Sequence, residues 1–498
     1  MSRSCYLAFD LGASSGRAIL GYLENDRLEI KEIHRFENRM LKLHGHLHWD
    51  LYGLLANIKE GMKKCAVGEI KPVSVGIDTW GVDFGLLAED GSLIGLPFAY
   101  RDSRTEGMME SFFASHSSET IYSLTGTQSL PINTLFQLWS MIRKRSPLLF
   151  KRTAKDLLFM PDLFHYFLAG VKKTEFSIAT TSQLFDLKEM RWQEGLCLEA
   201  GCDEMMQEVV MPGSILGSIS QELCEQTGFE PVPLVAVGTH DTASAVAAVP
   251  AQGTDWAFIS SGTWSLMGVE LKSPILTEKA RLANFTNEGG VNGTIRFLKN
   301  IAGLYLLQKC REIWSVDKEV SYDELIDEAE SAHSEHAYID PDHPDFLKPS
   351  NMVEAIQKRC QAIGIQVPHG RPRIVHCIMR SLALKYRYTL EQLRITQSKP
   401  INRIHIIGGG AKNRMLCQFT ANATRLPVYA GPVEATAIGN LLVQAMADGK
   451  VSSLDHLRGI VRDSFEIKIY EPNPSPEWED AWEIFQALVM KQRPDKEH

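Results

Sequence analysis

The chain has 498 residues, of which 44% are hydrophobic and 23% charged, and its formal net charge is -9. This composition is typical of a soluble globular protein, and the length favours two domains over one core. The negative charge is not offset by any block of Lys and Arg, which argues against a nucleic-acid or anionic-membrane surface.

The first residues lead directly into a short strand, without the apolar region of a secretory signal, and no apolar run is long enough to span a bilayer. The nine cysteines include no Cys-x-x-Cys pair, which fits a reduced compartment better than a disulfide scaffold. We therefore expect a cytoplasmic protein with no membrane partner.

A turn rich in glycine and serine lies between the first two expected strands, residues 6–9 and 18–22. It forms a hairpin and does not enter a helix, and neither a P-loop nor a dinucleotide-binding fingerprint occurs in it. Such a turn can bind phosphates through its backbone N–H groups, and Asp10 beside it could hold Mg²⁺ through water. An ordinary hairpin loop is the alternative.

Three histidines, His44, His46 and His48, alternate along the next expected strand and would share one face of it. A zinc site would need further ligands, and no Cys or carboxylate lies at ligand spacing. We therefore favour an exposed hairpin with incidental histidines.

Another buried strand is expected at residues 73–77, followed by a turn at residues 78–83 and a strand that continues to Leu87. Trp80 and Gly81 in that turn could form the floor of a sugar site, although a core tryptophan is the alternative. The compact charged segment at residues 100–104 could bind substrate hydroxyls or form an Arg–Asp network at the surface.

The middle of the chain contains the clearest strand-to-helix junction. Residues 234–237 form an apolar β-branched run, and an alanine-rich segment after Thr242 favours helix. In an open α/β sheet, ligands bind at such junctions. Asp241 lies in this one, where it could also simply cap the helix.

After an expected domain junction at residues 250–254, the second half repeats the strand, turn and strand pattern at residues 256–269. This repetition indicates a duplicated architecture with a nucleotide held between the halves. Three glycines at residues 408–410 then join a strand to a helix and would let a flat ligand such as adenosine lie against the backbone. A structural turn is the alternative there. Trp478 and Trp482 lie four residues apart, as expected for a docking helix.

Four motifs occur together in a fixed order: Asp-Leu-Gly-Ala-Ser-Ser-Gly-Arg17, Thr-His-Asp-Thr-Ala-Ser-Ala245, Ser-Ser-Gly-Thr-Trp-Ser-Leu-Met-Gly268 and Gly-Gly-Gly-Ala-Lys-Asn413. This set resembles the FGGY carbohydrate kinases, which belong to the superfamily of sugar kinases, actin and heat-shock ATPases. The similarity runs from about residue 5 to about residue 475. Within the family, the sequence motifs most resemble those of the branch that phosphorylates L-rhamnulose. The motifs that carry this resemblance are Gly-Ile-Asp-Thr-Trp-Gly-Val-Asp-Phe84, Tyr-Arg-Asp-Ser-Arg104 and Asn-Glu-Gly-Gly290.

The resemblance implies an α/β, two-domain sugar-kinase/actin-like fold, a duplicated ribonuclease H-like architecture with the active site in the interdomain cleft. Residues 1–248 would form the domain that binds the sugar and the phosphates. Residues 249–498 would form the nucleotide-binding domain with its C-terminal helix.

The same resemblance implies roles for individual residues. The phosphates of ATP would be met by Ala13, Ser14, Ser15, Gly16 and Arg17, with Mg²⁺ near Asp10. The rest of the nucleotide would meet Thr263, Gln308 and Gly410. The sugar would be held by Gly81, His240, Asp241, Thr242 and Asn300.

Asp241 would be the catalytic base, which accepts the proton of the 1-hydroxyl of L-rhamnulose as it attacks the γ-phosphate of ATP. Two positions depart from the family pattern. Thr239 stands where a relative has Ser, which keeps a hydroxyl, and Gln137 stands near where the general family often has Lys. The second departure weakens any transfer of glycerol or xylulose contacts to this chain.

Two other functions stay open from the sequence. The substrate could be another ketose, such as L-fuculose or L-xylulose, because one chain does not reveal hydroxyl stereochemistry. A non-catalytic nucleotide-binding regulator on the same fold is disfavoured by the retained Asp241 and by the lack of a basic patch. The expected partners are small molecules, L-rhamnulose and ATP, and the sequence does not predict an oligomeric state.

Overall fold

The computed structural model describes residues 3–144, 152–331, 337–473 and 475–491. Its contacts divide the chain into two compact units. Unit 1 comprises Met1–Gln252 together with two later segments, Glu270–Leu298 and Ala435–Phe465. Unit 2 comprises Gly253–Val269, Lys299–Glu434 and Glu466–His498. The chain thus returns to unit 1 twice after its first 252 residues. One boundary in the sequence therefore does not separate the two units.

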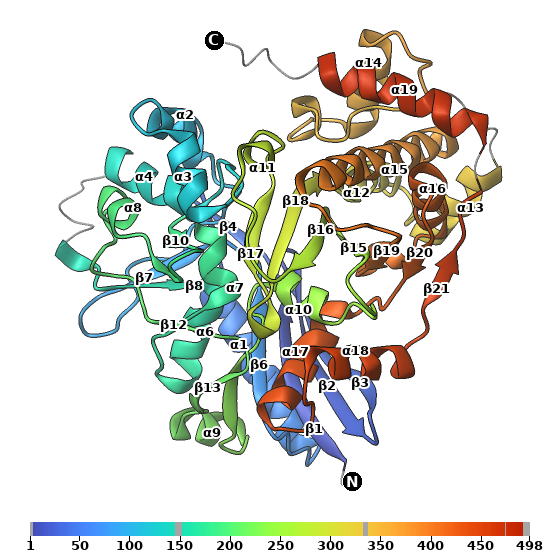
Figure 1. Ribbon diagram of the computed structural model, residues 1–498. Coiled ribbons are helices and arrows are strands. Elements are labelled where there is room, and N and C mark those ends of the chain that lie inside the picture. The colour runs from blue at the N-terminus through green and yellow to red at the C-terminus, as the bar shows by residue number, and fades with distance from the viewer. Residues whose placement is uncertain (1–2, 145–151, 332–336, 474, 492–498) are drawn as a thin grey trace. The chain divides into compact units, whose positions relative to one another are not determined.

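A mixed sheet forms the centre of unit 1, with the strand order β13-β14-β6-β1-β2-β3. β1 pairs antiparallel with β2 and parallel with β6, which pairs parallel with β14. The sheet can be followed in Figure 1, where β1 to β3 are blue. Its strands are β1 (Ser4–Leu11), β2 (Ser15–Glu24), β3 (Arg27–Glu37), β6 (Val75–Thr79), β13 (Ser214–Ser218) and β14 (Pro233–Ala236).

Helices cover both faces of this sheet, because its central strands are apolar on both sides. Alternate residues of β1, among them Leu7 and Phe9, belong to a buried cluster with residues of α1 (Leu51–Val67) and α6 (Met160–Ala169). From the other face, the Tyr6 hydroxyl donates a 2.8 Å hydrogen bond to Asp448, just after α17 (Ala435–Ala447). Asp10 has the same parity as Tyr6, so it lies on the α17 side of the sheet.

The other helices of unit 1 surround this centre, and α10 packs against α17. They are α2 (Met108–Phe113), α3 (Ser118–Thr125), α4 (Thr134–Lys144), α7 (Phe176–Ala179), α8 (Glu194–Glu199), α9 (Gln221–Thr227), α10 (Asp241–Ala247), α11 (Glu278–Leu282) and α18 (Leu454–Ser464).

Short strand pairs complete unit 1, and one of them is the hairpin that the sequence predicted at the histidines. β4 (Met40–Leu43) and β5 (His46–Trp49) form a hairpin, but His44 lies in its turn with φ +49°, so the three histidines do not share one strand. His46 Nδ1 lies 3.1 Å from Asp102, a partner that spacing did not suggest. The other pairs are β7 (Phe84–Leu87) with β8 (Asp156–Phe159), β9 (Thr174–Glu175) with β12 (Val209–Val210), and β10 (Phe185–Asp186) with β11 (Arg191–Trp192).

The sheet of unit 2 repeats the pattern of unit 1. β15 pairs antiparallel with β16 and parallel with β19, which pairs parallel with β20. The order β18-β16-β15-β19-β20 thus corresponds to β3-β2-β1-β6-β14, and each sheet ends in an antiparallel edge strand, β21 or β13. The strands are β15 (Trp256–Ser261), β16 (Trp264–Leu271), β18 (Ile295–Ala302), β19 (Arg403–Ile407), β20 (Val428–Ala430) and β21 (Lys468–Tyr470), and β17 (Thr286–Gly289) pairs with the unit 1 end of β18. The predicted α/β fold with a duplicated architecture is confirmed.

Helices of unit 2 pack around α15 (Arg371–Thr396), whose middle is buried on all sides. Trp478 and Trp482 of α19 (Pro476–Lys491) belong to a buried cluster with Leu384 and Tyr388 of α15, as expected for a docking helix. The other helices are α12 (Tyr305–Trp314), α13 (Tyr322–Ser331), α14 (Met352–Ala362) and α16 (Arg414–Thr424). In the described parts of the chain, none of these helices or those of unit 1 is long and apolar enough to cross a membrane.

The close approach of α10 and α17 depends on Gly439, where a Cβ would collide with the backbone oxygen of Ser244. We expect Gly439→Ala to lower the free energy of unfolding by about 1–3 kcal/mol, because the two helices must move apart. Denaturant unfolding of the purified protein measures this change. The matched control is Gly459→Ala in α18, where the nearest atom, Arg462 Nη2, is 3.6 Å from the added Cβ. It should be neutral or stabilising by roughly 0.5–1 kcal/mol. Equal losses in both variants would contradict the account.

Candidate active site

Three chain segments of unit 1 end at one edge of its sheet. Asp10 lies opposite Asp78 in the parallel pairing of β1 with β6. One residue later, Thr79 forms a bridge with His240, and its backbone N–H donates to the Thr239 carbonyl at 2.8 Å. The turn between β14 and α10 therefore meets the carboxyl ends of β1 and β6, the edge at which α/β sheets bind ligands.

Asp241 is the first residue of α10 and does not cap it. The N-cap is His240, and no side chain forms a capping hydrogen bond there. The Asp241 carboxylate instead accepts a 3.1 Å hydrogen bond from the Thr242 hydroxyl, and its side chain is 34% exposed. The capping role that the sequence left open is wrong, and the carboxylate stays accessible to a ligand.

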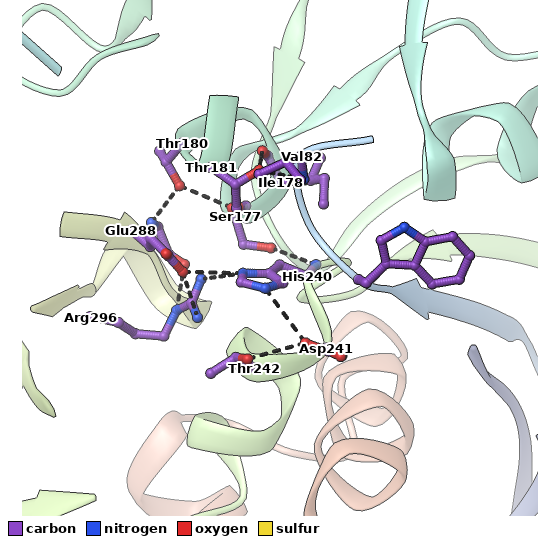
Figure 2. Close-up of polar contacts among 12 residues, drawn as sticks. Val82, Ser177, Ile178, Thr180, Thr181, His240, Asp241, Thr242, Glu288 and Arg296 are labelled. Carbon is purple, nitrogen blue, oxygen red and sulfur yellow. Dashed lines mark hydrogen bonds and ion pairs between the residues drawn. The ribbon is translucent and has the colours of Figure 1, made fainter. Parts of the chain in front are cut away.

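His240 lies between two carboxylates (Figure 2). Its Nε2 is 3.5 Å from Asp241 Oδ1, and its Nδ1 is 3.1 Å from Glu288 Oε2. The His240 backbone N–H donates to Ser177 Oγ at 3.1 Å. The ring and the backbone are thus both held by polar groups from other segments of unit 1.

A buried carboxyl group, Glu175, fixes the backbone beneath His240. It accepts hydrogen bonds from the Thr239 backbone N–H at 3.1 Å and from the Thr239 hydroxyl at 2.7 Å, and it also accepts from the Ser177 hydroxyl. Burial raises the pKa of Glu175, although each of these hydrogen bonds acts in the opposite direction. Thr239 and Ser177 therefore serve to position the His240 turn.

Glu288 and Arg296 face each other directly across the β17–β18 pair, so their side chains share one face of it. Arg296 Nη1 lies 3.2 Å from Glu288 Oε2, and Arg296 Nε donates to the Gly289 carbonyl at 2.9 Å. Burial alone would raise the pKa of Glu288, but Arg296 and His240 outweigh it and hold the pKa below its ordinary value. Glu288 is therefore an ionised carboxylate inside the protein.

The backbone at Gly81 comes close to this group. A Cβ at Gly81 would lie 3.4 Å from His240 Nε2 and 3.2 Å from Thr181 Cγ2. The next residue, Val82, has φ +67°, a conformation that is strained for a β-branched side chain. It is maintained by hydrogen bonds from the Val82 N–H to Thr181 Oγ1 at 3.1 Å and from Thr134 Oγ1 to the Val82 carbonyl at 2.7 Å. Strain of this kind is characteristic of functional sites.

Trp80 has the surroundings of a core tryptophan, the alternative that the sequence left open. Its side chain is buried, its ring packs 4.1 Å from that of Trp49, and its Nε1 donates to Asp83 at 3.0 Å. Asp83 also accepts from Trp49 Nε1 and Gln137 Nε2, while burial raises its pKa to about 6. The sequence placed Asp78 in the turn before these residues, but β6 extends to Thr79 and includes it.

The charged network of residues 100–104 lies inside the protein and not at its surface. Asp102 and Arg104 are both buried. Arg104 Nη2 donates to Gln137 Oε1 at 2.5 Å, and Asp102 accepts from the Leu47 and Arg104 backbone N–H groups. This network supports the loop that contains Gly81, because Gln137, which accepts from Arg104, also donates to Asp83.

The glycine and serine hairpin between β1 and β2 contains the residues that the sequence predicted to contact phosphates. Arg17 Nη2 forms a 2.5 Å ion pair with Asp10, so the cation and the carboxylate expected at this site lie together. Asn38 braces the turn from β3's end, because its Nδ2 donates to the Gly12 carbonyl at 2.9 Å. Ser14 is exposed, whereas Gly16 packs under the Phe36 ring, where a Cβ would collide. Ala13 and Ser15 are half-buried beside them.

Asp78 is a buried carboxyl group beside Asp10. Its pKa lies well above the ordinary value, first because of burial and then because of the negative charge of Asp10, with a further contribution from Asp241. Asn440 of α17 donates to it at 2.6 Å, and Gln444 donates to Asn440 at 2.7 Å. Asp10, Asp78 and Asp241 therefore concentrate acidic groups at this edge of the sheet.

The remaining expected site residues belong to unit 2. Thr263 Oγ1 donates to Gln308 Oε1 at 3.2 Å. A Cβ at Gly410 would collide with the Ser261 side chain, whereas Gly409 is exposed with open space beside it. The open position of this glycine turn is therefore Gly409, and Gly410 packs against β15. Asn300 is half-buried on β18.

The sequence did not single out Glu288, Arg296, Glu175, Ser177 or Thr181 as site residues. One signal was present for the first two. Opposite charges eight residues apart flank the Gly290 to Gly293 turn, a spacing that fits a cross-strand pair in a hairpin. Glu175 and Ser177 carry no such signal, because only the tertiary fold brings them to Thr239 and His240.

Two family models match the chain. The N-terminal domain of the FGGY family of carbohydrate kinases matches residues 5–248, and the C-terminal domain of the same family matches residues 257–447.

Several curated relatives are similar over nearly their whole length and carry the name rhamnulokinase. The protein from Bacteroides thetaiotaomicron is 44% identical over 97% of this chain and 99% of its own. The protein from Halalkalibacterium halodurans is 42% identical over 93% of this chain and 98% of its own. The protein from Bacillus subtilis is 39% identical over 98% of this chain and 99% of its own.

Solved structures share the fold at much lower identity. Xylulose kinase from Lactobacillus acidophilus, in a ligand-bound form, superposes with a TM-score of 0.81 at 14% identity, covering 98% of each chain. Plasmodium falciparum glycerol kinase with ADP superposes with a TM-score of 0.80 at 14% identity, covering 99% of each chain. At this identity the likeness concerns the fold alone.

The raised pKa of Asp78 predicts how the stability of the protein depends on pH. A carboxyl group whose pKa is higher in the folded state stabilises the fold below its unfolded pKa, and this contribution is lost as pH rises through the folded pKa. Asp78→Asn removes the charge and keeps an oxygen that can accept from Asn440. We expect its melting temperature to rise relative to the wild type as pH increases from about 5 to about 8.

Thermal melts of both proteins across this range measure the difference. The control is Asp90→Asn, at an exposed turn where hydrogen bonds from Ser92 lower the pKa of Asp90, and it should show no gain at high pH. A difference between Asp78→Asn and wild type that does not change with pH would contradict the assignment.

Proposed function

Because the chain belongs to the FGGY family of carbohydrate kinases, we propose that it transfers the γ-phosphate of ATP to the 1-hydroxyl of L-rhamnulose. The products are L-rhamnulose 1-phosphate and ADP. The name of the curated relatives, at 38–44% identity over nearly full length, supports this substrate. The observation that carries the catalytic part is the carboxylate of Asp241, which begins α10 at the sheet edge without capping the helix.

Asp241 is the proposed general base. Phosphoryl transfer passes through a loose transition state, so the protein mainly aligns the reactants and stabilises charge. As O1 of the sugar bonds to the γ-phosphorus and the bond from phosphorus to the β,γ-bridging oxygen breaks, the hydroxyl proton passes to the Asp241 carboxylate. ADP leaves with the electron pair of the broken bond. Gly81, His240, Thr242 and Asn300 are the proposed sugar contacts.

Residues 13–17 are the proposed contact with the ATP phosphates, and Thr263, Gln308 and Gly410 are the proposed contacts with the rest of the nucleotide. Arg17 already forms an ion pair with Asp10 at 2.5 Å. Phosphate oxygens compete well for a guanidinium group, because they accept its paired N–H donors. ATP binding would therefore release Asp10 from Arg17.

Asp10 fits a role in holding Mg²⁺. This ion prefers oxygen ligands, keeps several waters and uses one or two carboxylates together with substrate phosphates. Among the described residues, no group of three or more His, Cys, Asp and Glu side chains has the geometry to hold a metal alone, which fits a shared, water-rich site. When bound, Mg²⁺ would neutralise charge on the β- and γ-phosphates.

The choice of sugar is tested by the rate of ADP release with a panel of L-rhamnulose, L-fuculose, L-xylulose and glycerol. We expect the highest kcat/KM for L-rhamnulose, because relatives that are similar over 93–97% of this chain are named rhamnulokinase. Protein with the Asp241→Asn substitution, purified in the same way, controls for contaminating kinases. A higher kcat/KM for another ketose would agree with the proposed sugar phosphorylation but contradict L-rhamnulose as the substrate.

The role of Asp241 is tested by Asp241→Asn, which keeps the size of the side chain and removes the base. We expect kcat to fall by about 10²- to 10⁴-fold, the range for loss of a general base. The affinity for ATP, measured by calorimetry, should not change. The matched control is Asp455→Asn, another acidic residue in the first turn of a helix of unit 1, which should keep the wild-type kcat. An unchanged kcat in Asp241→Asn would contradict the proposal that Asp241 is the general base.

A further inference from the structure

The hairpin between β15 and β16 is held on one side by the segment that leads into α12. The backbone N–H of Leu304 donates to the Gly262 carbonyl at 3.0 Å. The next N–H, that of Tyr305, donates to the Thr263 carbonyl at 3.1 Å. Gly303 lies directly against the turn, because a Cβ there would be 2.8 Å from the Gly262 oxygen. The conformation of the turn therefore depends on the position of this segment.

These contacts also orient the N–H groups of the turn. In a planar trans peptide, the C=O group and the N–H group of the next residue point in opposite directions. Because the Gly262 and Thr263 carbonyls both point toward the start of α12, the next N–H groups in the chain point away from it. Those N–H groups belong to Thr263 and Trp264. Successive backbone N–H groups in a turn can bind an anion, and the anionic part of a nucleotide is its phosphates.

Asp342 holds the segment before α12 in place. Its Oδ1 accepts a 2.7 Å hydrogen bond from the backbone N–H of Ala302, the last residue of β18. Its Oδ2 lies 2.9 Å from Nζ of Lys385 in α15. Gly303 follows Ala302 directly, so the Asp342 carboxylate links α15 to the segment that contacts the turn.

Lys385 is a charged side chain inside the protein. It is only 5% exposed, and its Nζ also lies 2.7 Å from Asp340 Oδ1. Burial alone would lower the pKa of Lys385, but Asp342 and Asp340 outweigh it and raise the pKa. If Asp342 were replaced, Asp340 would still pair with the ammonium group. The fold can therefore tolerate a change at Asp342 without leaving a buried charge unpaired.

The next residue of α15 contacts the other side of the hairpin. The Tyr386 and Ser265 hydroxyl oxygens lie 2.7 Å apart, and both side chains are fully buried. Ser265 is the second residue of β16, directly after Trp264. Two neighbouring residues of α15 thus act on the hairpin, Tyr386 through β16 and Lys385 through Asp342 and β18.

We propose that Asp342, held by Lys385, is a positioning residue for the nucleotide. Through Ala302 it fixes the segment that sets the conformation of the turn, so that the N–H groups of Thr263 and Trp264 face a phosphate group. This inference rests on the proposed nucleotide contact of Thr263, and it adds a residue to which the sequence analysis gave no role.

Asp342→Ala removes both contacts of the carboxylate. We expect the Kd of the full-length protein for ADP, measured by calorimetry, to rise about 10-fold, as for the loss of a hydrogen bond to a charged group. KM for ATP should rise to the same extent. The affinity for adenosine, which has no phosphate, should not change.

A second variant and a control sharpen this test. Asp342→Asn keeps an oxygen that can accept from Ala302 and should raise the Kd for ADP only about 3-fold, because a neutral acceptor forms a weaker hydrogen bond. The matched control is Asp255→Ala. Asp255 is 32% exposed, against 29% for Asp342, and pairs with Arg403 at 2.8 Å. It lies just before β15, at the end of that strand far from the hairpin, so its replacement should leave the Kd for ADP unchanged.

Equal losses of affinity for adenosine and ADP would mean that Asp342 only supports the structure of unit 2, and would overturn the proposal. An unchanged Kd for ADP in Asp342→Ala would also overturn it, as would an equal loss in Asp255→Ala. If Asp342→Ala does not fold, an unchanged Kd in Asp342→Asn has the same consequence. ADP binding needs no sugar, so a wild type that binds ADP but does not phosphorylate L-rhamnulose would contradict the proposed function alone.

Discussion

Three acidic side chains gather where β1, β6 and the β14–α10 turn end, and their proximity constrains the whole site. Asp10, Asp78 and Asp241 lie close enough for the first and the last to raise the pKa of Asp78. Carboxyl groups that share a buried site cannot all ionise without compensation. Arg17 compensates Asp10, and Asn440 donates to Asp78. Asp241 is the most exposed of the three and is therefore the carboxylate best placed to exchange a proton with a ligand.

The surroundings of Asp241 are fixed by segments that are distant in sequence. Glu175 holds Thr239, Ser177 holds the His240 backbone, and Glu288 faces the His240 ring. These groups are buried and polar, so each unmet contact would cost free energy, and together they specify one arrangement of the turn. Such preorganisation is what phosphoryl transfer requires, because the protein contributes mainly alignment and electrostatic stabilisation.

Local sequence patterns predicted the elements of the site that depend on nearby residues, namely its turns and the strands beside them. The apolar runs beside residues 12–16 and 262–263 define both hairpins, and the β-branched run before Gly238 defines the strand that leads to Asp241. Partners that only the tertiary fold supplies could not be read in this way. Trp80 is buried because Trp49 and Asp83 meet it, and His44 leaves its strand because the chain turns there. The return of residues 270–298 and 435–465 to unit 1 likewise leaves no local signal.

In the proposed reaction, the Asp241 carboxylate receives the proton of the reacting sugar hydroxyl. The decisive experiment is a crystal structure of the protein with L-rhamnulose and a non-hydrolysable ATP analogue. We expect an Asp241 carboxylate oxygen to lie about 2.6–3.2 Å from O1 of the sugar, the distance required of a general base. A sugar bound with O1 beyond the reach of Asp241, while another side chain contacts that hydroxyl, would contradict it.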